Sequence, residues 1–236
     1  MRKRARFLVL FDIDGTLIRG AGPHHRLALV KGIRDVTGLS ATLNGVATSG
    51  TLDRDLIRLA MRASGASERR VSFLLPRIVK ESEKAYLRHC PTDLKAKLCP
   101  GVPELLRALN ASDAALALVS GNLARIAWRK LECAGIRQHF ALGAFSGDGQ
   151  TRAGLAKTAL ELARARRIVD EDVGVVLIGD HPNDIAAAKQ NGFGSVGVAT
   201  GLVAANELAD DDPDLLLDDL REVTPEHLLR HARPVP

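Results

Sequence analysis

Residues 6–19 read RFLVLFDIDGTLIR, and this stretch decides the expected fold. Five apolar residues, 7–11, run directly into Asp12 and Asp14, which are separated only by Ile13. A short, uninterrupted apolar run is typical of a strand that is buried on both faces of a parallel sheet. Two carboxylates this close together repel each other, so we expect a cation or a ligand to compensate their charge.

Similar apolar runs recur along the chain and predict further buried strands. They lie at residues 115–119, 141–145, 173–178 and 195–198, with residues 215–217 as a possible edge strand. Helical patterns lie between them, at residues 102–109, 123–134, 154–164 and 183–191. Strands that alternate with helices predict an α/β fold, a doubly wound, Rossmann-like parallel sheet with right-handed crossovers. Functional groups in such sheets gather at the carboxyl ends of the strands.

One segment, residues 18–98, departs from this alternation. It contains three helical patterns and no convincing strand. The helical patterns lie at residues 25–37, 54–63 and 71–89. Glycine and proline clusters at residues 20–23 and 99–101 suit hinges at its two ends. We therefore expect an α/β core made of residues 1–17 and 99–236, with residues 18–98 inserted as a helical cap.

The composition is typical of a globular protein, with 46% hydrophobic and 26% charged residues. Its net charge of +5 is spread along the chain and aromatic residues make up only 3%, which argues against a nucleic-acid platform. No apolar run approaches the roughly 18 residues of a membrane span, and the run after the basic N-terminus is too short for export. The three cysteines lack CxxC spacing, which favours a reducing compartment. We expect a cytoplasmic protein with a small-molecule partner, no nucleic acid and no membrane; the sequence does not predict its oligomeric state.

The first acidic pair superficially resembles the start of an EF-hand calcium loop. That loop requires glycine at its sixth position and glutamate at its twelfth. Counted from Asp12, Gly15 is fourth and Pro23 is twelfth, so the sequence excludes this site. Gly15 and Thr16 instead predict a turn in which the backbone can approach a ligand closely.

Polar residues also follow the later strands. Residues 118–122 read LVSGN, so that Ser120, Gly121 and Asn122 lie between a strand and a helix. Backbone N–H groups at a helix start, together with a small hydroxyl, can hold an anion, although serine there is more often a simple N-cap.

A cation and two further acids complete the pattern. Arg152 is expected on the loop after the third strand, with Lys157 as a competing cation inside the following helix. Residues 176–184 read VLIGDHPND, so that Asp180 ends a strand and Asp184 follows one helical turn later. We expect Asp180 to face the site and Asp184 to support it from behind.

In this order, the elements resemble the haloacid dehalogenase superfamily, specifically its phosphoglycolate-phosphatase-like members with a helical cap. The matching elements are FDIDGTL at 11–17, VSGN at 119–122, Arg152, and GDHPND at 179–184. The resemblance implies a phosphoric monoester hydrolase in which Asp12 attacks phosphorus to form an aspartyl-phosphate. Asp14 would protonate the leaving oxygen and then activate water. Phosphoryl transfer places negative charge on the equatorial oxygens, which independently favours a metal and a cation.

The resemblance also implies the remaining roles. Mg²⁺ would be held by Asp12, the backbone carbonyl of Asp14, and Asp180, with Asp184 bound directly or supporting from behind. The phosphoryl oxygens would be held by Thr16, Ser120, Gly121, Asn122 and Arg152. Two departures stand out, since many members have lysine where Arg152 lies, and threonine or serine is common where His181 lies.

Two other functions remain open. A phosphoglucomutase-like phosphotransferase keeps both acids of the first motif, although Thr16 argues weakly against it because those enzymes often have valine there. A catalytically silent binding or regulatory module on the same fold is the alternative from a different class. Dehalogenases and phosphonatases replace the second acid, so Asp14 argues against both.

Substrate choice is expected to depend on the helical cap, which can close over the site. Its candidate contacts are Arg19, His24, His25, Thr51, Asp53 and Lys80. Phosphoglycolate and the monophosphates of sugars or nucleosides all fit this reading, and the sequence does not choose among them.

Overall fold

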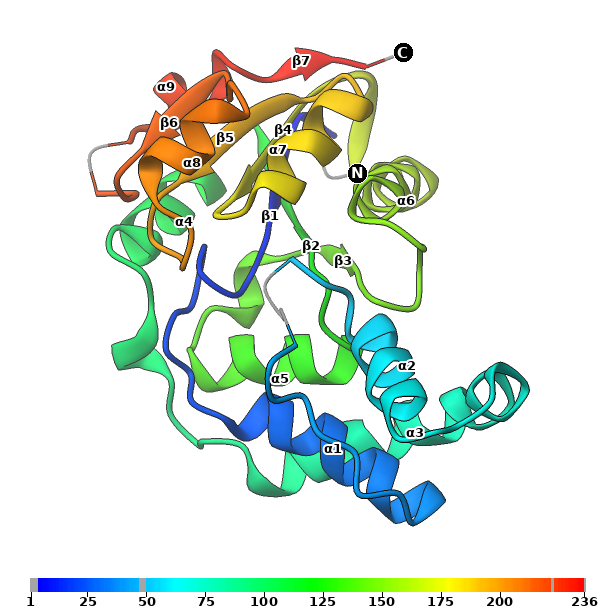
Figure 1. Ribbon diagram of the computed structural model, residues 1–236. Coiled ribbons are helices and arrows are strands. Elements are labelled where there is room, and N and C mark those ends of the chain that lie inside the picture. The colour runs from blue at the N-terminus through cyan, green and yellow to red at the C-terminus, as the bar shows by residue number, and fades with distance from the viewer. Residues whose placement is uncertain (1–3, 47–49, 222, 236) are drawn as a thin grey trace.

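The computed structural model describes residues 4–46, 50–221 and 223–235 (Figure 1). Residues 1–3 of the basic N-terminus and residues 47–49, which precede the second helix of the segment 18–98, lie outside the described residues. Within the described ranges, no helix is both long and apolar enough to cross a membrane.

Among the described residues, seven strands form one sheet, in the order β3-β2-β1-β4-β5-β6, with β7 paired to β4. The strands are β1 (Ala5–Phe11), β2 (Ala114–Val119), β3 (Leu142–Ala144), β4 (Val169–Gly179), β5 (Gly194–Val198), β6 (Leu215–Leu217) and β7 (Arg233–Pro234). All pairings are parallel except that of β7 with β4. The predicted doubly wound α/β sheet is thus confirmed. Its order reverses at β1, because the chain first builds outward to β3 and then returns to add β4 on the other side.

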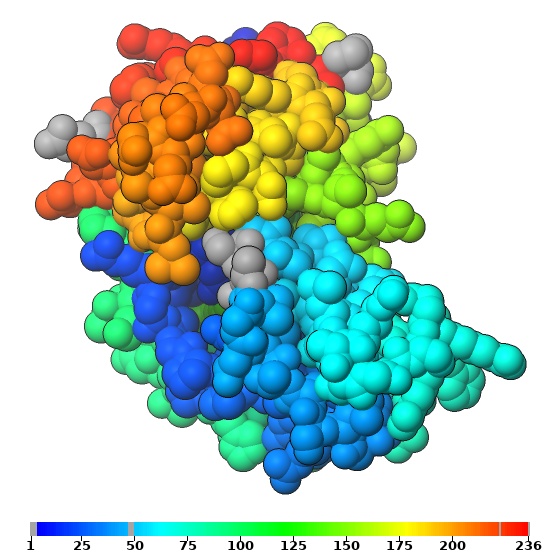
Figure 2. Space-filling view, viewed as in Figure 1, coloured from blue at the N-terminus to red at the C-terminus, as the bar shows by residue number. Residues whose placement is uncertain are grey.

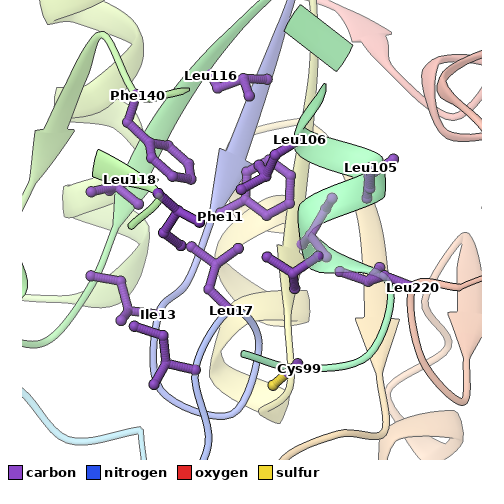
Figure 3. Packing of buried hydrophobic residues seen from close by; sticks show 14 of the residues in the cluster. Phe11, Ile13, Leu17, Cys99, Leu105, Leu106, Leu116, Leu118, Phe140 and Leu220 are labelled. Carbon is purple, nitrogen blue, oxygen red and sulfur yellow. The ribbon is translucent and has the colours of Figure 1, made fainter. Parts of the chain in front are cut away.

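Helices cover both faces of the sheet (Figure 1). They are α4 (Val102–Asn110), α5 (Ala124–Cys133), α6 (Arg152–Ala165), α7 (Pro182–Gln190), α8 (Ala205–Asp210) and α9 (Pro225–Leu229), with 3-10 turns at Lys95–Lys97 and Arg137–His139. Alternate residues of β1 serve the two faces: Val9 and Phe11 pack with α4 and α5, and Leu8 and Leu10 pack with α6 and α7. Figure 3 shows Phe11 among its neighbours, and its ring meets Phe140 edge to face at a centroid distance of 5.9 Å.

The described part of the segment 18–98 contains three further α-helices, α1 (His24–Thr37), α2 (Asp53–Ala63) and α3 (Glu68–His89). They share a hydrophobic cluster of their own, which Leu123 and Ile126 from the start of α5 also join. Figure 1 shows these helices below the sheet, and Figure 2 shows their blue and cyan surface meeting the yellow and orange core. The boundaries of core and cap stay a prediction.

Several details differ from the sequence-based expectations. Arg152 is not on a loop but is the first residue of α6, where Thr151 caps the helix by accepting a hydrogen bond from Gly154 N. β1 ends at Phe11 as the apolar run predicts, so Asp12 and Asp14 lie in the loop that follows the strand. The short elements α8, α9 and β7 were not predicted, because two to six residues carry too little periodicity.

Candidate active site

The ends of the three neighbouring strands β1, β2 and β4 bring Asp12, Ser120 and Asp180 to one edge of the sheet. All three side chains are buried. The backbone extends the strand pairing past β1, because Asp12 N donates to the carbonyl of Ile178 at 3.0 Å. Asp12 is therefore held at the point where the strand order reverses, which is the usual ligand crevice of such sheets.

Asp12, Asp180 and Asp184 form a buried carboxylate cluster. Each can offer an oxygen such that these atoms all lie within 4.8 Å of one another. Arg152 reaches it from α6: its Nη1 donates to Asp12 Oδ1 at 2.8 Å, and its Nε lies 3.1 Å from Asp184 Oδ1. Burial would lower the pKa of Arg152, but the charges of Asp12 and Asp184 raise it, so the guanidinium stays charged.

The pKa values of Asp12, Asp180 and Asp184 are all raised, because the three acids are buried close together. Burial raises the pKa of Asp180 to about 8, and the charges of Asp12 and Asp184 add to the shift. Burial likewise raises the pKa of Asp184 to about 7 and raises that of Asp12, although Arg152 partly offsets both increases. Three acids that compete for one arginine are thus short of positive charge.

This cluster fits a divalent cation. Both oxygens of Asp184 lack a hydrogen-bond donor among the described residues, although the side chain is buried. Arg152 Nε lies beside Oδ1 as an ion-pair partner, but buried carboxylate oxygens that accept no hydrogen bond are costly, and a hard cation bound by oxygen ligands would satisfy them. Gly15 and Gly201 leave the space that the Asp180 carboxylate occupies, since a Cβ at either position would come within 2.1 Å or less of Asp180 Oδ2.

Asp14 lies in a different environment. Its side chain is 45% exposed, and both its oxygens accept hydrogen bonds from Lys130 Nζ at 2.7 Å. Partial burial would raise the pKa of Asp14, but the charge of Lys130 and the hydrogen bonds from Lys130 and Asn122 lower it below its ordinary value. Asn122 Nδ2 also donates to Asp14 Oδ2 at 2.7 Å.

Among the polar residues around the acids, Thr16 contacts the buried carboxylate cluster and Asn122 contacts Asp14. Thr16, predicted to hold phosphate, donates from Oγ1 to Asp180 Oδ1 at 3.1 Å, and its phosphate-binding role stays a prediction. Ser120 Oγ accepts from Asn122 Nδ2 at 2.7 Å, which leaves the serine's own hydroxyl proton available. Gly121 follows Ser120, and the carbonyl of Gly121 accepts from Asp53 N at 2.8 Å.

The protein matches a known family in sequence. Residues 9–189 match the model of the haloacid dehalogenase-like hydrolases, which covers more than half of the chain. The chain belongs to this family. The match begins within β1 and ends within α7, so it includes all of the strand ends described above.

Known relatives of this haloacid dehalogenase-like chain carry phosphatase names. A phosphoglycolate phosphatase of Salmonella choleraesuis is 30% identical over 135 residues, which cover 57% of this chain and 53% of that protein. The chain thus matches about half the length of the first curated relatives. A phosphoglycolate phosphatase of Agrobacterium fabrum is 24% identical, with 92% of this chain and 91% of that protein covered.

Solved structures support the fold of the family. The β-phosphoglucomutase of Clostridium difficile superposes with a TM-score of 0.68 at 17% identity and covers 96% of each chain. A hydrolase from Pseudomonas syringae gives a TM-score of 0.63 at 20% identity, with 96% of this chain and 99% of that chain covered. At these identities the likeness shows a shared fold.

A cavity of about 720 Å³ joins the strand ends to the helical segment of this haloacid dehalogenase-like protein. Of the predicted cap contacts, Arg19, His25, Thr51 and Asp53 line it, whereas His24 and Lys80 are not among its lining residues. Lys157, the competing cation, is exposed on α6 and also outside the lining.

Lys130 is the main residue that sequence reasoning missed. It lies on α5 and is 2% exposed. Its signal was present in the sequence: Lys130 follows Ile126 and Ala127 at helical spacing, so it falls on the apolar face of the predicted helix 123–134. A lysine on such a face rarely stays buried without a partner.

Proposed function

We propose that this protein is a phosphatase that hydrolyses a small phosphate monoester through an aspartyl-phosphate on Asp12. The observation that carries the proposal is the buried cluster of Asp12, Asp180 and Asp184 against Arg152, with Asp14 two residues from the nucleophile. The phosphatase names of the relatives support the same reaction class.

In the first half-reaction, a carboxylate oxygen of Asp12 attacks phosphorus and the bond to the ester oxygen breaks. Asp14 is ionised in the free protein, so it takes up a proton from the monoanionic form of the phosphate ester as the ester binds and gives that proton to the leaving oxygen. Arg152, which already contacts Asp12 Oδ1, offsets the repulsion between the carboxylate and the phosphate. At about 4 Å and an effective dielectric near 20, two unit charges interact by about 4 kcal/mol, so this cation is significant.

In the second half-reaction, Asp14 takes a proton from a water molecule that attacks the phosphorus. The bond between phosphorus and Asp12 breaks, which releases inorganic phosphate and restores both acids. The hydroxyl of Ser120 and the N–H of Gly121 would hold the phosphoryl oxygens, since the Ser120 proton is not committed to Asn122. Thr16 would act through Asp180, whose carboxylate it contacts.

Mg²⁺ would be held by Asp12, Asp180 and Asp184, together with the backbone carbonyl of Asp14. When bound, it supplies positive charge that neutralises the phosphoryl oxygens and the crowded carboxylates. The oxygens of Asp184, which accept no hydrogen bond from the described residues, and the raised pKa values of Asp180 and Asp184 support a divalent ion at this position. Arg152 then remains paired with Asp12 and orients the nucleophile.

We further propose that residues 18–98 act as a cap over a core of residues 1–17 and 99–236. The cavity that α1 and α2 share with the strand ends suits a small phosphorylated metabolite. A cytoplasmic location, close to such metabolites, fits the reduced state of the three free cysteines.

The test is phosphate release from a panel of phosphomonoesters, with and without Mg²⁺. We expect Mg²⁺-dependent release that is abolished in Asp12→Asn. Exchange of sugar-phosphate isomers without release of phosphate would instead support a phosphoglucomutase-like phosphotransferase. Binding of phosphate esters without turnover of any of them would support a catalytically silent module.

A further inference from the structure

The buried ammonium group of Lys130 is not explained by phosphoryl transfer itself. We propose that Lys130 is a positioning residue that fixes the Asp14 carboxylate toward the leaving group and links it, through His25 and Asp53, to helices α1 and α2. This inference rests on the proposed phosphatase function, because it assigns the support of that reaction's acid and base.

Four acceptors surround the Lys130 ammonium. Nζ lies 2.7 Å from both oxygens of Asp14, 2.9 Å from Asn122 Oδ1 and 3.1 Å from His25 Nδ1. These groups come from the loop after β1, the start of α5, and α1. An ammonium has three N–H donors, so these contacts occupy all of them. Lys130 therefore has no proton to spare for a substrate and acts through Asp14.

The contact with Lys130 fixes the tautomer of His25. Lys130 has only donors, so Nδ1 of His25 must accept, and the ring proton lies on Nε2. That nitrogen donates to Asp53 Oδ2 at 2.8 Å. Asp53 Oδ2 also accepts from Leu123 N at 2.7 Å, beside the Ser120–Asn122 loop. A continuous chain of hydrogen bonds thus runs from Asp14 through α1 and α2 and back to the phosphate-binding loop.

This chain of hydrogen bonds explains how the Asp14 carboxylate is held in one orientation. The Asp14 side chain is 45% exposed to the cavity, and an exposed carboxylate would otherwise sample several rotamers. Lys130 holds both its oxygens and Asn122 holds one, so the carboxylate is fixed before a substrate arrives. Pre-organised groups contribute to catalysis because their geometry is set in advance of the reaction.

The consequence is a dependence on the leaving group. An ester of an aliphatic alcohol needs a proton on its departing oxygen, whereas p-nitrophenolate departs as a stable anion. Misplacing Asp14 should therefore slow the first far more than the second. Because Asp14 also serves the hydrolysis of the aspartyl-phosphate, which is common to both esters, the first half-reaction is compared through kcat/KM. General acid catalysis contributes about 10²–10⁴-fold, so we expect Lys130→Met to lower kcat/KM for an alkyl phosphate by about 10²-fold and that for p-nitrophenyl phosphate by less than about 3-fold.

Two conservative variants separate positioning from simple stability. Lys130→Arg keeps a buried cation and should recover part of the alkyl phosphate activity. His25→Gln can still accept from Lys130 and donate to Asp53, so it should lose less selectivity than His25→Ala. Lys157→Met, which removes an exposed lysine of α6, is the matched control and should behave as the native protein.

The experiment measures kcat and KM for both esters in each variant, with the Tm as a check of folding. An equal loss of kcat/KM for both esters in Lys130→Met, or none for either, overturns the inference while leaving the phosphatase function intact. If Lys130→Met fails to fold, the comparison of His25→Ala with His25→Gln tests the inference: an equal loss of kcat/KM for both esters in His25→Ala contradicts the positioning role. Failure of the native protein to hydrolyse either ester overturns the proposed function and this inference together.

Discussion

Asp12 and Asp14 are separated by one residue, yet they lie in opposite electrostatic environments. Asp12 is buried with Asp180 and Asp184, and the three acids compete for Arg152. Asp14 is half-exposed, and an ammonium group contacts both of its oxygens. Accordingly, the pKa of Asp12 is raised and that of Asp14 is lowered.

The difference shows how one short loop can carry two chemical roles. A cluster with excess negative charge favours a divalent cation and holds a nucleophile against it. A carboxylate balanced by a neighbouring ammonium keeps a fixed direction without needing a metal. Each of the following predictions changes a charge or a side-chain volume at the buried cluster of Asp12, Asp180 and Asp184, in order of decreasing expected effect.

The largest effect is expected for the nucleophile. Asp12→Asn should lower phosphate release by a factor of about 10⁴ or more, because no other group can take over the covalent step. Steady-state assays measure the loss, and the exposed Asp172→Asn on β4 is the matched control. Turnover of Asp12→Asn close to that of the native protein would contradict the assignment.

The second largest effect is expected for Arg152, which pairs with Asp12 and Asp184. Arg152→Met should reduce kcat by about 10²–10³-fold, since it removes the cation that faces Asp12 and Asp184. Arg152→Lys should recover only part of this loss, because lysine lacks the fork that reaches both acids. Lys157→Met on the same helix should retain full activity, and an equal loss there would refute the role of Arg152.

Without metal, the excess negative charge of Asp12, Asp180 and Asp184 should make the stability of the folded protein depend on pH. The pKa values of Asp180 and Asp184 are raised to about 8 and about 7, so the folded state binds more protons than the unfolded state between about pH 4 and those values. Their contribution is fully present below about pH 4 and is lost as pH rises through about 7 to 8. In EDTA, the Tm should therefore fall between about pH 5 and about pH 8.

Mg²⁺ should restore the Tm at the upper end of this range, because binding to the folded state stabilises it. Asp180→Asn should flatten the decline, whereas Asp172→Asn should leave its slope unchanged. A metal-free Tm that rises over the same pH interval would contradict the raised pKa values.

The smallest effect is expected from a substitution that fills the space occupied by the Asp180 carboxylate. The Cβ in Gly201→Ala would lie 1.7 Å from Asp180 Oδ2, so the carboxylate must move. We expect a loss of about 1–3 kcal/mol in the free energy of unfolding and a weaker response of the Tm to Mg²⁺. Gly147→Ala is the control, since its nearest neighbour, a carbon of Arg54, lies at 3.6 Å. Equal effects of the two substitutions would argue that Asp180 is not confined.

The sheet was predictable from the sequence because its strands are buried on both faces. Continuous apolar runs placed β1, β2, β4 and β5 within a few residues, and the acids that follow β1 and β4 marked the carboxyl edge. The start of helix α6 was predicted less accurately than the strands. The capping hydroxyl of Thr151 makes Arg152 the first residue of α6, whereas the apolar pattern indicated a later start.

The surroundings of Asp14 could not be predicted in the same way. Lys130 is 116 residues away from Asp14 in the sequence, and its contact depends on how α5 packs against the loop after β1. His25 and Asp53 belong to helices whose position over the sheet no local pattern specifies. Local periodicity predicts which face of a helix is buried, but not which distant charge meets it.

The most direct test of the account is whether Asp12 becomes phosphorylated. The native protein would be mixed with substrate and Mg²⁺, quenched in acid within one turnover, and analysed by intact-protein and peptide mass spectrometry. We predict one added phosphoryl group, located on the peptide that contains Asp12 and absent from Asp12→Asn. Turnover without a phosphorylated protein, or a phosphoryl group on another residue, would contradict the mechanism.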